Sequence, residues 1–195
     1  MGNLNFTKQK IQASIDVKQK LMSDEKLLSL IEIVADEMVT SFKNGGCVLF
    51  CGNGGSAADA QHISAELSGR FYSDREPLNA EALHVNTSYL TAVANDYSYD
   101  EVYSRLVKAK GKKGDVLVGI STSGNSANVI KAFETANTLG MITIAMTGET
   151  GGKMKDACKY LLNVPSKDTP RIQESHILIG HIICEMVENK FFNLK

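Results

Sequence analysis

The stretch Cys47-Val48-Leu49-Phe50-Cys51-Gly52-Asn53-Gly54-Gly55-Ser56 decides the fold. Its first five residues are all apolar, which is typical of a strand that is buried on both faces. The glycine-rich turn leads directly into an Ala-rich helical pattern that continues to Leu67. A buried strand, a tight turn and a helix indicate the first half of a β-α-β unit in a parallel sheet.

The same order recurs further along the chain. The apolar run Val116–Ile120 is followed by the polar loop Ser121–Ser126 and by a helical pattern that reaches Leu139. Further strands are predicted over residues 80–85, 141–146 and 160–164, and a last helix over residues 171–190. Strands that alternate with helices predict an α/β fold, here a three-layer α/β/α sandwich with a five-stranded parallel sheet.

Residues 1–44 predict two helices that precede the sheet. The second has a rhythm of three and four residues, at Leu27, Leu30, Ile31, Val34, Met38 and Phe42. Ser23-Asp24 is a plausible helix cap between the two, and Asn44-Gly45-Gly46 ends the second. With no linker and no repeat in the chain, we expect one domain over residues 1–195 that carries an N-terminal helical hairpin.

Composition excludes several classes of function. The 195 residues hold 21 Lys and Arg against 22 Asp and Glu, and a net charge of −1 argues against nucleic acid and anionic membranes as partners. No apolar run approaches the roughly 20 residues that span a bilayer. The four cysteines have neither metal-site spacing nor the density of a disulfide scaffold, so we expect reduced thiols and a cytoplasmic location.

The loop Ser121–Ser126 is a candidate phosphate site. It holds four hydroxyls, from Ser121, Thr122, Ser123 and Ser126, at a place where a strand runs into a helix. Free backbone N–H groups, the positive end of the helix dipole and hydroxyls together bind anions. A capped helix start also favours serine, but four hydroxyls in six residues exceed what capping needs.

The first loop admits a rival interpretation. Gly52-x-Gly54-x-x-Ala57 fits a permissive dinucleotide-binding pattern. The acidic residue expected at the end of the next strand is absent, because that segment closes with His84-Val85-Asn86. A nicotinamide-dependent oxidoreductase is therefore a weak hypothesis, and we expect no tight dinucleotide binding.

Polar groups able to do chemistry occur on two helices. His62 and Glu66 are four residues apart, about 40° around a helix axis, so both side chains can point at one place. An exposed ion pair is the structural alternative. Arg70 follows one turn later and is able to hold an anion.

The last predicted helix carries Gln173, Glu174, His176 and His181 among apolar residues. Gln173 and His181 are about 12 Å apart along a straight helix, too far to share one centre easily. Either a neighbouring subunit supplies one of them, or the helix begins after Gln173. His176 is expected to be structural or to support the site from behind.

Several motifs, in order and with matching spacing, carry a family resemblance. They are Cys51–Glu66, Ala94-Asn95-Asp96, Gly119–Ser126, Thr147–Met154 and Arg171-Ile-Gln-Glu-Ser-His176. Together they closely resemble the phosphoheptose isomerases of the sugar isomerase (SIS) superfamily, over nearly the whole chain. The resemblance implies a flavodoxin-like SIS fold, a homotetramer with active sites at subunit contacts, and one zinc ion per subunit.

The resemblance also implies the activity and the site. Such enzymes interconvert sedoheptulose 7-phosphate and D-glycero-D-manno-heptose 7-phosphate, the first step toward ADP- or GDP-activated heptose for lipopolysaccharide and related glycoconjugates in bacteria. Ser121, Thr122, Ser123 and Ser126 would hold the phosphate. Asn53, Gly54, Gly55, Asn95 and Asp96 would line the sugar. Ser56 either contacts the ligand or caps its helix, and Glu66, Arg70 and Gln173 are further candidate substrate contacts. His62, Glu66, Gln173 and His181 would hold zinc. An acidic substrate contact of the family is in doubt, because Pro170 stands in its place and Asp168 lies two residues earlier.

Aldose–ketose isomerisation moves a proton between neighbouring carbons through an enediolate. It needs a base at carbon and an acid at oxygen, for which Glu66 and His181 are the candidates. A carboxylate bound to a metal is less basic, so we expect Glu66 to leave the metal, or to bind it weakly, when substrate arrives. The alternative is a non-catalytic SIS binding module associated with the replication initiator. Such a module lacks counterparts of Glu66 and His181, whereas this chain has both.

Overall fold

Five parallel strands form a sheet in the order β2-β1-β3-β4-β5. The computed structural model describes residues 2–194, with side chains from Leu4 onward. The strands are β1 (Val48–Gly52), β2 (Ala80–Ala82), β3 (Val116–Ser121), β4 (Ile142–Thr147) and β5 (Tyr160–Asn163). Register is regular between the central strands, where Val48 lies opposite Val116 and Val116 opposite Ile142. The predicted five-stranded parallel sheet is confirmed.

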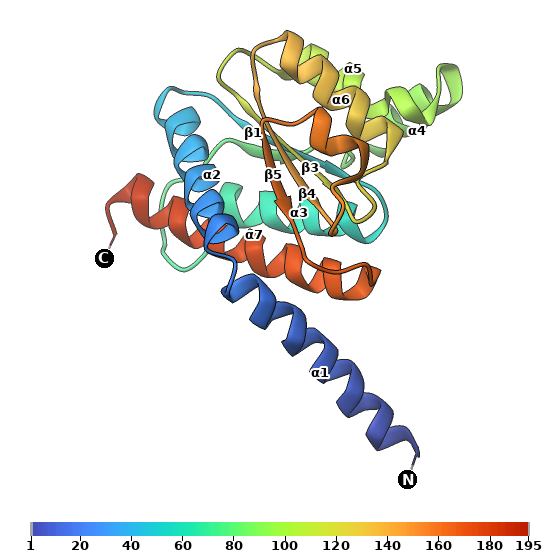
Figure 1. Cartoon of the computed structure of the whole chain (residues 1–195). Coiled ribbons are helices and arrows are strands. Elements are labelled where there is room, and N and C mark those ends of the chain that lie inside the picture. The colour runs from blue at the N-terminus through green and yellow to red at the C-terminus, as the bar shows by residue number, and fades with distance from the viewer. Residues whose placement is uncertain (1, 195) are drawn as a thin grey trace.

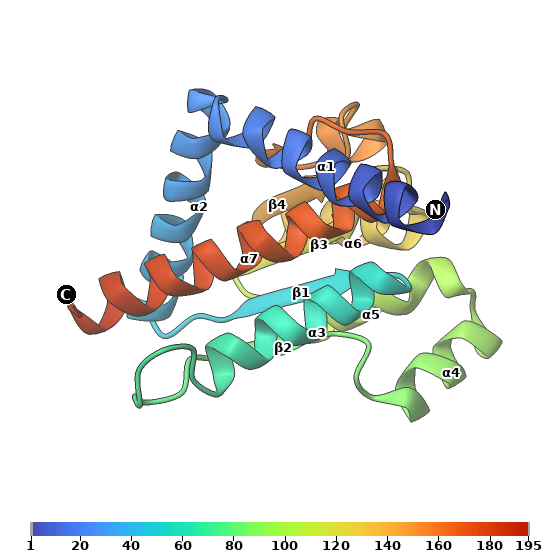
Figure 2. The same cartoon turned by 90° about the horizontal axis from the view of Figure 1, so that it is seen from below.

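Helices cover both faces of this sheet (Figures 1 and 2). One face packs against α2 (Glu25–Lys43), α3 (Gly55–Ser68) and α7 (Thr169–Phe192), and the other against α4 (Thr87–Asp96), α5 (Val102–Lys110) and α6 (Ala127–Thr138). Short 3-10 turns lie at Tyr99–Glu101 and Gly152–Asp156. Because neighbouring strand residues point to opposite faces, Phe50 joins the first core and Leu49 the second. The predicted three-layer sandwich is confirmed.

Element boundaries differ from the expectations by small amounts. The edge strand β2 has only three residues instead of six, because pairing with β1 ends at Ala82. The helix α7 begins at Thr169, and Pro170 lies in its first turn. Proline is tolerated there because a backbone N–H in the first turn has no partner within the helix. Gln173 is therefore helical, and the predicted non-helical start near that residue is wrong.

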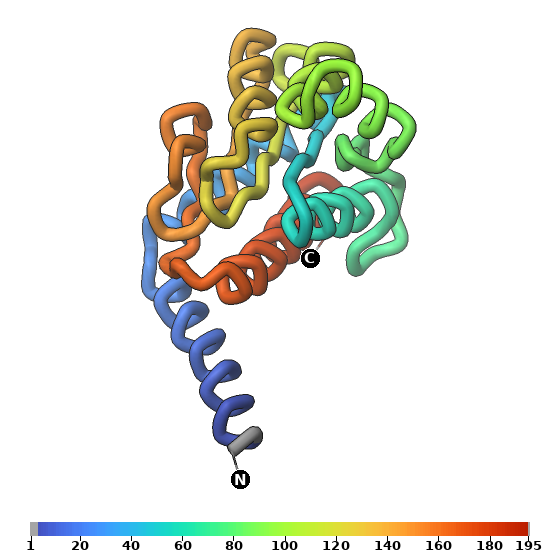
Figure 3. Tube along the Cα trace, turned by 90° about the vertical axis from the view of Figure 1, so that its right-hand side faces the viewer, coloured from blue at the N-terminus to red at the C-terminus, as the bar shows by residue number. Residues whose placement is uncertain are grey.

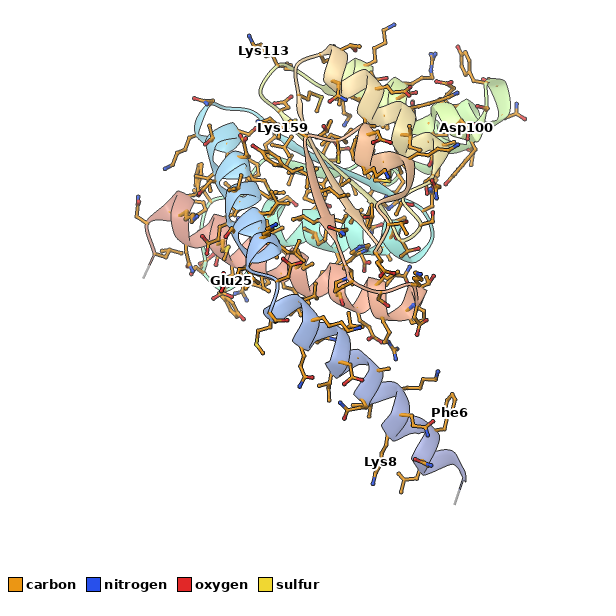
Figure 4. All side chains as sticks on the ribbon, in the orientation of Figure 1. Phe6, Lys8, Glu25, Asp100, Lys113 and Lys159 are labelled. Carbon is orange, nitrogen blue, oxygen red and sulfur yellow. The ribbon has the colours of Figure 1, made fainter. Side chains whose placement is uncertain are left out.

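The N-terminal pair of helices is also confirmed. After α1 (Gly2–Met22), the Asp24 side chain accepts a hydrogen bond from Leu27 N and starts α2, and Asn44 ends α2. The helix α1 projects away from the body of the molecule (Figures 1 and 3), and its labelled residues Phe6 and Lys8 lie far out along it (Figure 4). Phe6 is 59% exposed and Met22 72%, so much of the apolar surface of α1 is uncovered within one chain.

The strand order reverses direction between β1 and β3. The connection from β1 to β2 carries α3 on one face, whereas the connection from β3 to β4 carries α6 on the other. The loops after β1 and β3 therefore diverge at the carboxyl ends of the strands, which is where open α/β sheets form the crevice that binds ligands. Both glycine- and serine-rich loops lie at this place. Within residues 2–194, the helices are all too short or too polar to span a membrane.

Candidate active site

Two helices, α3 and α7, carry the predicted acid–base residues. The helices α3 and α7 lie side by side (Figures 2 and 3) and approach closely where Gly180 faces Ile63. A methyl group at Gly180 would come within 2.4 Å of Ile63 Cδ1, so glycine allows the two helices to approach without moving the Ile63 side chain. The close contact places the polar side chains of the two helices opposite one another.

His62, Glu66 and His181 form one cluster. Their nearest ligand atoms all lie within 4.8 Å of one another. His62 Nε2 is 3.1 Å from Glu66 Oε1 and 3.1 Å from His181 Nε2. The His62 side chain is 52% exposed and that of Glu66 25%, so solvent and ligands reach the cluster. The structure thus brings together both predicted catalytic residues and three of the four predicted metal ligands.

This donor set fits a zinc ion. Imidazole nitrogen and carboxylate oxygen are ordinary zinc ligands, and catalytic zinc sites use three protein ligands and keep one position open. Two Nε2 atoms that face each other at 3.1 Å share at most one proton between two neutral rings, so a cation between them would satisfy both lone pairs. Three residues of this chain, His62, Glu66 and His181, therefore fit a zinc ion.

Gln173 lies elsewhere in the chain. A methyl group at Gly55 would come within 2.5 Å of Gln173 Nε2, so this amide covers the first turn of α3, two turns before His62. No hydrogen bond joins Gln173 to the cluster among the described residues. Gln173 thus lies over the start of α3, whereas His62 and Glu66 lie two and three turns further along the same helix.

The hydroxyl loop after β3 is not organised as a simple helix cap. Ser126 precedes α6 but makes no side-chain capping bond, and its Oγ lies 2.8 Å from Ser121 Oγ instead. Ser123 Oγ lies 3.4 Å from the same Ser121 hydroxyl and accepts a bond from Asn125 N. The hydroxyls are gathered on one another, which leaves them available to an anion at the start of α6.

A pocket of about 210 Å³ adjoins this loop. Thr122 and Ser123 line one side, and Ser166, Lys167 and Thr169 another. Lys167 Nζ lies 3.7 Å from Glu149 Oε2 at the pocket, and it is a cation that the sequence analysis did not place there. The pocket has room for a phosphate group.

The two loops are joined by a pair of amides. Asn53 and Asn128 exchange two hydrogen bonds of 2.9 Å, and Asn128 is only 3% exposed. Asn128 was missed in the sequence, although an amide two residues after the hydroxyl loop and on the sheet side of a helix was a usable signal. The pair fixes the first loop against the start of α6 across the crevice.

The remaining predicted residues occupy varied places. Ser56 is buried, and Gly54 has φ of +56°, a backbone conformation that favours glycine. Arg70 is exposed just after α3, with no side-chain bond among the described residues. Asn95 and Asp96 are exposed at the end of α4, where they bond to each other at 3.0 Å and to no other predicted site residue.

Two further titratable groups lie behind the site. His176 is fully buried, and its Nε2 lies 3.0 Å from Thr147 O at the end of β4. Burial lowers the pKa of His176 to about 4, so this imidazole is neutral and structural. Asp59, one turn before His62, has a buried oxygen without a partner in the described chain, and burial raises its pKa. Asp59 was not singled out in the sequence.

Comparisons with known proteins agree with this architecture. The family model described as "SIS domain" matches residues 13–148. The chain is 53% identical to a phosphoheptose isomerase of Aneurinibacillus thermoaerophilus, over 98% of this chain and 96% of that protein. It is 50% identical to a phosphoheptose isomerase of Clostridium acetobutylicum, over 98% and 97% of the two chains.

Solved structures are equally similar. A phosphoheptose isomerase from Neisseria gonorrhoeae superposes with a TM-score of 0.90 at 46% identity, covering 95% of this chain and 98% of that one. A phosphoheptose isomerase from Francisella tularensis gives a TM-score of 0.92 at 36% identity, covering 97% and 100%. The similarity spans the N-terminal helices, the sheet and α7 alike.

Proposed function

The chain belongs to the phosphoheptose isomerase family of SIS-domain enzymes, and we propose that it interconverts sedoheptulose 7-phosphate and D-glycero-D-manno-heptose 7-phosphate through an enediolate. The resemblance predicted from the motifs is confirmed at the level of the family. A non-catalytic SIS module associated with the replication initiator is not favoured, since the similar chains are named as isomerases.

One observation carries this proposal: a carboxylate and an imidazole from adjacent helices share a single cluster. Glu66 and His181 contribute atoms within 4.8 Å of one another, on α3 and α7. Glu66 acts as the base that removes the proton from the carbon next to the carbonyl. His181 acts as the acid that donates a proton to the carbonyl oxygen. Glu66 then delivers its proton to the former carbonyl carbon, and His181 takes the proton from the hydroxyl on the neighbouring carbon, which moves the carbonyl by one carbon.

The substrate spans the crevice from this cluster to the hydroxyl loop. Ser121, Thr122, Ser123 and Ser126 bind the phosphate with neutral donors at the start of α6, which leaves the dianion desolvated but fully hydrogen-bonded. Asn53, Gly54, Gly55, Ser56, Arg70, Asn95, Asp96 and Gln173 contact the sugar. The amide pair between Asn53 and Asn128 supports a fixed distance between the two ends of the substrate.

His62, Glu66 and His181 hold a zinc ion, and Gln173 completes the ligand set. When bound, zinc acts as a Lewis acid that stabilises negative charge on the substrate oxygens. Glu66 would then be both a ligand and the base, so its carboxylate could take the proton from carbon only if the metal held it weakly or released it.

We assign the active protein to a homotetramer of single SIS domains, with sites at subunit contacts, in the cytoplasm. Two observations support the shared site. Gln173 lies over Gly55 at the start of α3, and Asn95 and Asp96 lie exposed at the end of α4. The uncovered apolar residues of α1 supply a surface for association.

The direct test is incubation of the purified protein with sedoheptulose 7-phosphate and detection of an aldose 7-phosphate. Removal of metal with a chelator is expected to lower turnover, and added zinc to restore it. Mixing Glu66→Gln with Gln173→Ala subunits tests the shared site, since a composite site regains activity in mixed oligomers. Absence of aldose product from metal-loaded protein would exclude the isomerase assignment.

A further inference from the structure

The segment that follows α3 is tied to α7 by one buried carboxylate. Glu188 accepts hydrogen bonds from the backbone N–H groups of Phe71 (3.1 Å), Tyr72 (3.0 Å) and Ser73 (2.8 Å). Residues 69–79 make up this α3–β2 loop. Three consecutive N–H donors on one carboxylate fix the backbone of the loop against α7, because a buried carboxylate is costly unless its oxygens are bonded.

Arg75, from the same loop, completes the arrangement. Its Nε donates to Glu188 Oε2 at 2.9 Å, and the two side chains are only 4% and 2% exposed. Its remaining nitrogens donate to the carbonyl oxygens of Glu66 (2.8 Å), Leu67 (2.8 Å), Gly69 (2.9 Å) and Glu76 (3.1 Å). Arg75 thereby satisfies the last carbonyls of α3, including that of the proposed base.

The loop also touches the proposed acid. The Phe71 ring lies 5.8 Å from the His181 ring, at an interplanar angle of 34°. The His181 ring also lies 5.2 Å from the His62 ring. Since Phe71 N is one of the three donors to Glu188, the carboxylate determines where this aromatic ring sits against the imidazole.

Contacts on both sides of the cluster therefore hold α3 against α7. On one side, Gly180 lets α7 approach Ile63 of α3. On the other, Glu188 lies two turns beyond His181 on α7 and reaches the loop that ends α3. Between these two contacts stand Glu66 and His181, whose relative position sets the proton transfers.

We propose that Glu188 is a positioning residue for the isomerisation: through Arg75 and Phe71 it holds the base and the acid in register. The proposal rests on the roles assigned to Glu66 and His181 above. Burial alone raises the pKa of Glu188, but the three N–H donors and Arg75 outweigh it and hold this pKa below its usual value. Glu188 therefore stays ionised and does not itself exchange protons with substrate.

The test compares two buried carboxylates that both accept backbone N–H groups. Asp115, directly before β3, accepts from Cys47 N (2.9 Å) and Lys112 N (2.8 Å), and it bonds to neither α3 nor α7 among the described residues. Glu188→Gln is expected to lower kcat about tenfold with KM within about twofold, because misplaced catalytic groups lose transition-state stabilisation. Asp115→Asn is expected to keep kcat within about twofold, measured per folded molecule.

Phe71 supplies a second, milder variant that keeps Glu188 intact. Phe71→Leu is expected to lower kcat about fivefold, and Phe71→Tyr to restore it, because tyrosine keeps the ring. Equal kcat loss in Glu188→Gln and Asp115→Asn would overturn the proposal, as would wild-type kcat in both Glu188→Gln and Phe71→Leu.

A readout without catalysis separates this proposal from the isomerase assignment. In metal-free protein, the imidazole proton resonances of His181, identified by their loss in His181→Gln, are expected to shift in Phe71→Leu and in Glu188→Gln but not in Asp115→Asn. Unmoved resonances in the first two variants would overturn the positioning role. If the wild type is inactive but the His181 resonances shift in Phe71→Leu and Glu188→Gln, the isomerase assignment is wrong and the positioning role of Glu188 stands.

Discussion

The loops after β1 and after β3, between which the strand order reverses, share one local pattern but use it differently. Each follows a buried strand and precedes a helix, and each contains a glycine with positive φ, at Gly54 and at Gly124. The loop after β1 exposes little side chain of its own and brings α3 under Gln173 at Gly55. The loop after β3 gathers hydroxyls, with Ser121 and Ser126 2.8 Å apart.

This difference shows how one sheet edge divides two tasks. The loop after β1 delivers a helix whose next turns hold the chemistry, at His62 and Glu66. The loop after β3 is itself the binding surface. A small loop lets the helix approach its neighbours, whereas a loop rich in hydroxyls offers donors to an anion. Variants in the two regions should therefore affect different kinetic constants.

The largest effect is expected on the chemical side. Glu66→Gln should lower kcat about a thousandfold, because an amide cannot remove the proton from carbon. Glu185→Gln, an exposed carboxylate on α7, is the matched control and should keep full turnover. The measurement is turnover of sedoheptulose 7-phosphate at saturating substrate, with bound metal determined for each variant. Near-wild-type kcat in metal-loaded Glu66→Gln would remove Glu66 from the role of base.

The bridge between the two loops is expected to contribute next. Asn128→Ala removes both hydrogen bonds of the Asn53 amide, whereas Val129 N keeps Ser126 O as an acceptor, so the free energy of unfolding should fall by about 2 kcal/mol. Urea unfolding of the two single variants and the double variant Asn53→Ala/Asn128→Ala measures their coupling. Asn79→Ala, an exposed amide, should leave stability nearly unchanged. Strict additivity of the two single effects would show that the pair does not join the loops.

On the binding side, Ser126→Ala should raise KM about tenfold with kcat nearly unchanged, because phosphate binding is shared by ground and transition states. The free energy of unfolding should fall by only about 0.5 kcal/mol, since the Ser126 hydroxyl makes no capping bond and Ser121 Oγ keeps Ser123 Oγ as a second partner. Thr138→Ala, at the other end of α6, is the control. A loss of about 1 kcal/mol in unfolding free energy with unchanged KM would identify Ser126 as a cap instead.

The smallest expected effect is on the pH dependence of stability, and it comes from the buried His176. Its pKa is about 4 in the folded chain against 6.5 for an ordinary histidine, so only the unfolded state gains a proton as pH falls through this window. This contribution to stability is present above pH 6.5 and is lost between 6.5 and 4. From pH 7 to pH 5.5 the wild type should lose about 1 kcal/mol more than His176→Gln. Urea unfolding at the two pH values gives this loss. An equal loss of unfolding free energy in the wild type and in His176→Gln would contradict the buried neutral imidazole.

Much of this architecture was readable from local patterns. The apolar runs at Val48–Cys51 and Val116–Ile120 predicted buried parallel strands because their residues lack polar alternation. Asp24 and Asn44 marked the ends of α2 through ordinary capping chemistry. His62 and Glu66 could be paired because one helix turn separates them.

Other features were out of reach of such patterns. The register of α3 against α7, and hence the meeting of His62 with His181 across 119 positions of chain, depends on the contact between Gly180 and Ile63. Asn128, Arg75 and Glu188 look like ordinary polar helix and loop residues in the sequence, and their partners are distant in it. The extension of α7 to Thr169 was missed because Pro170 resembles a helix boundary, although proline suits a first turn.

The sequence by itself determined the strands, the helices, the family and the residue types available for acid–base and anion chemistry, because these depend on short-range periodicity and local motifs. Only the tertiary structure decided which of those residues share a centre. That choice follows from how closely two helices can pack and from which buried charges find partners, and both are properties of segments that are far apart along the chain.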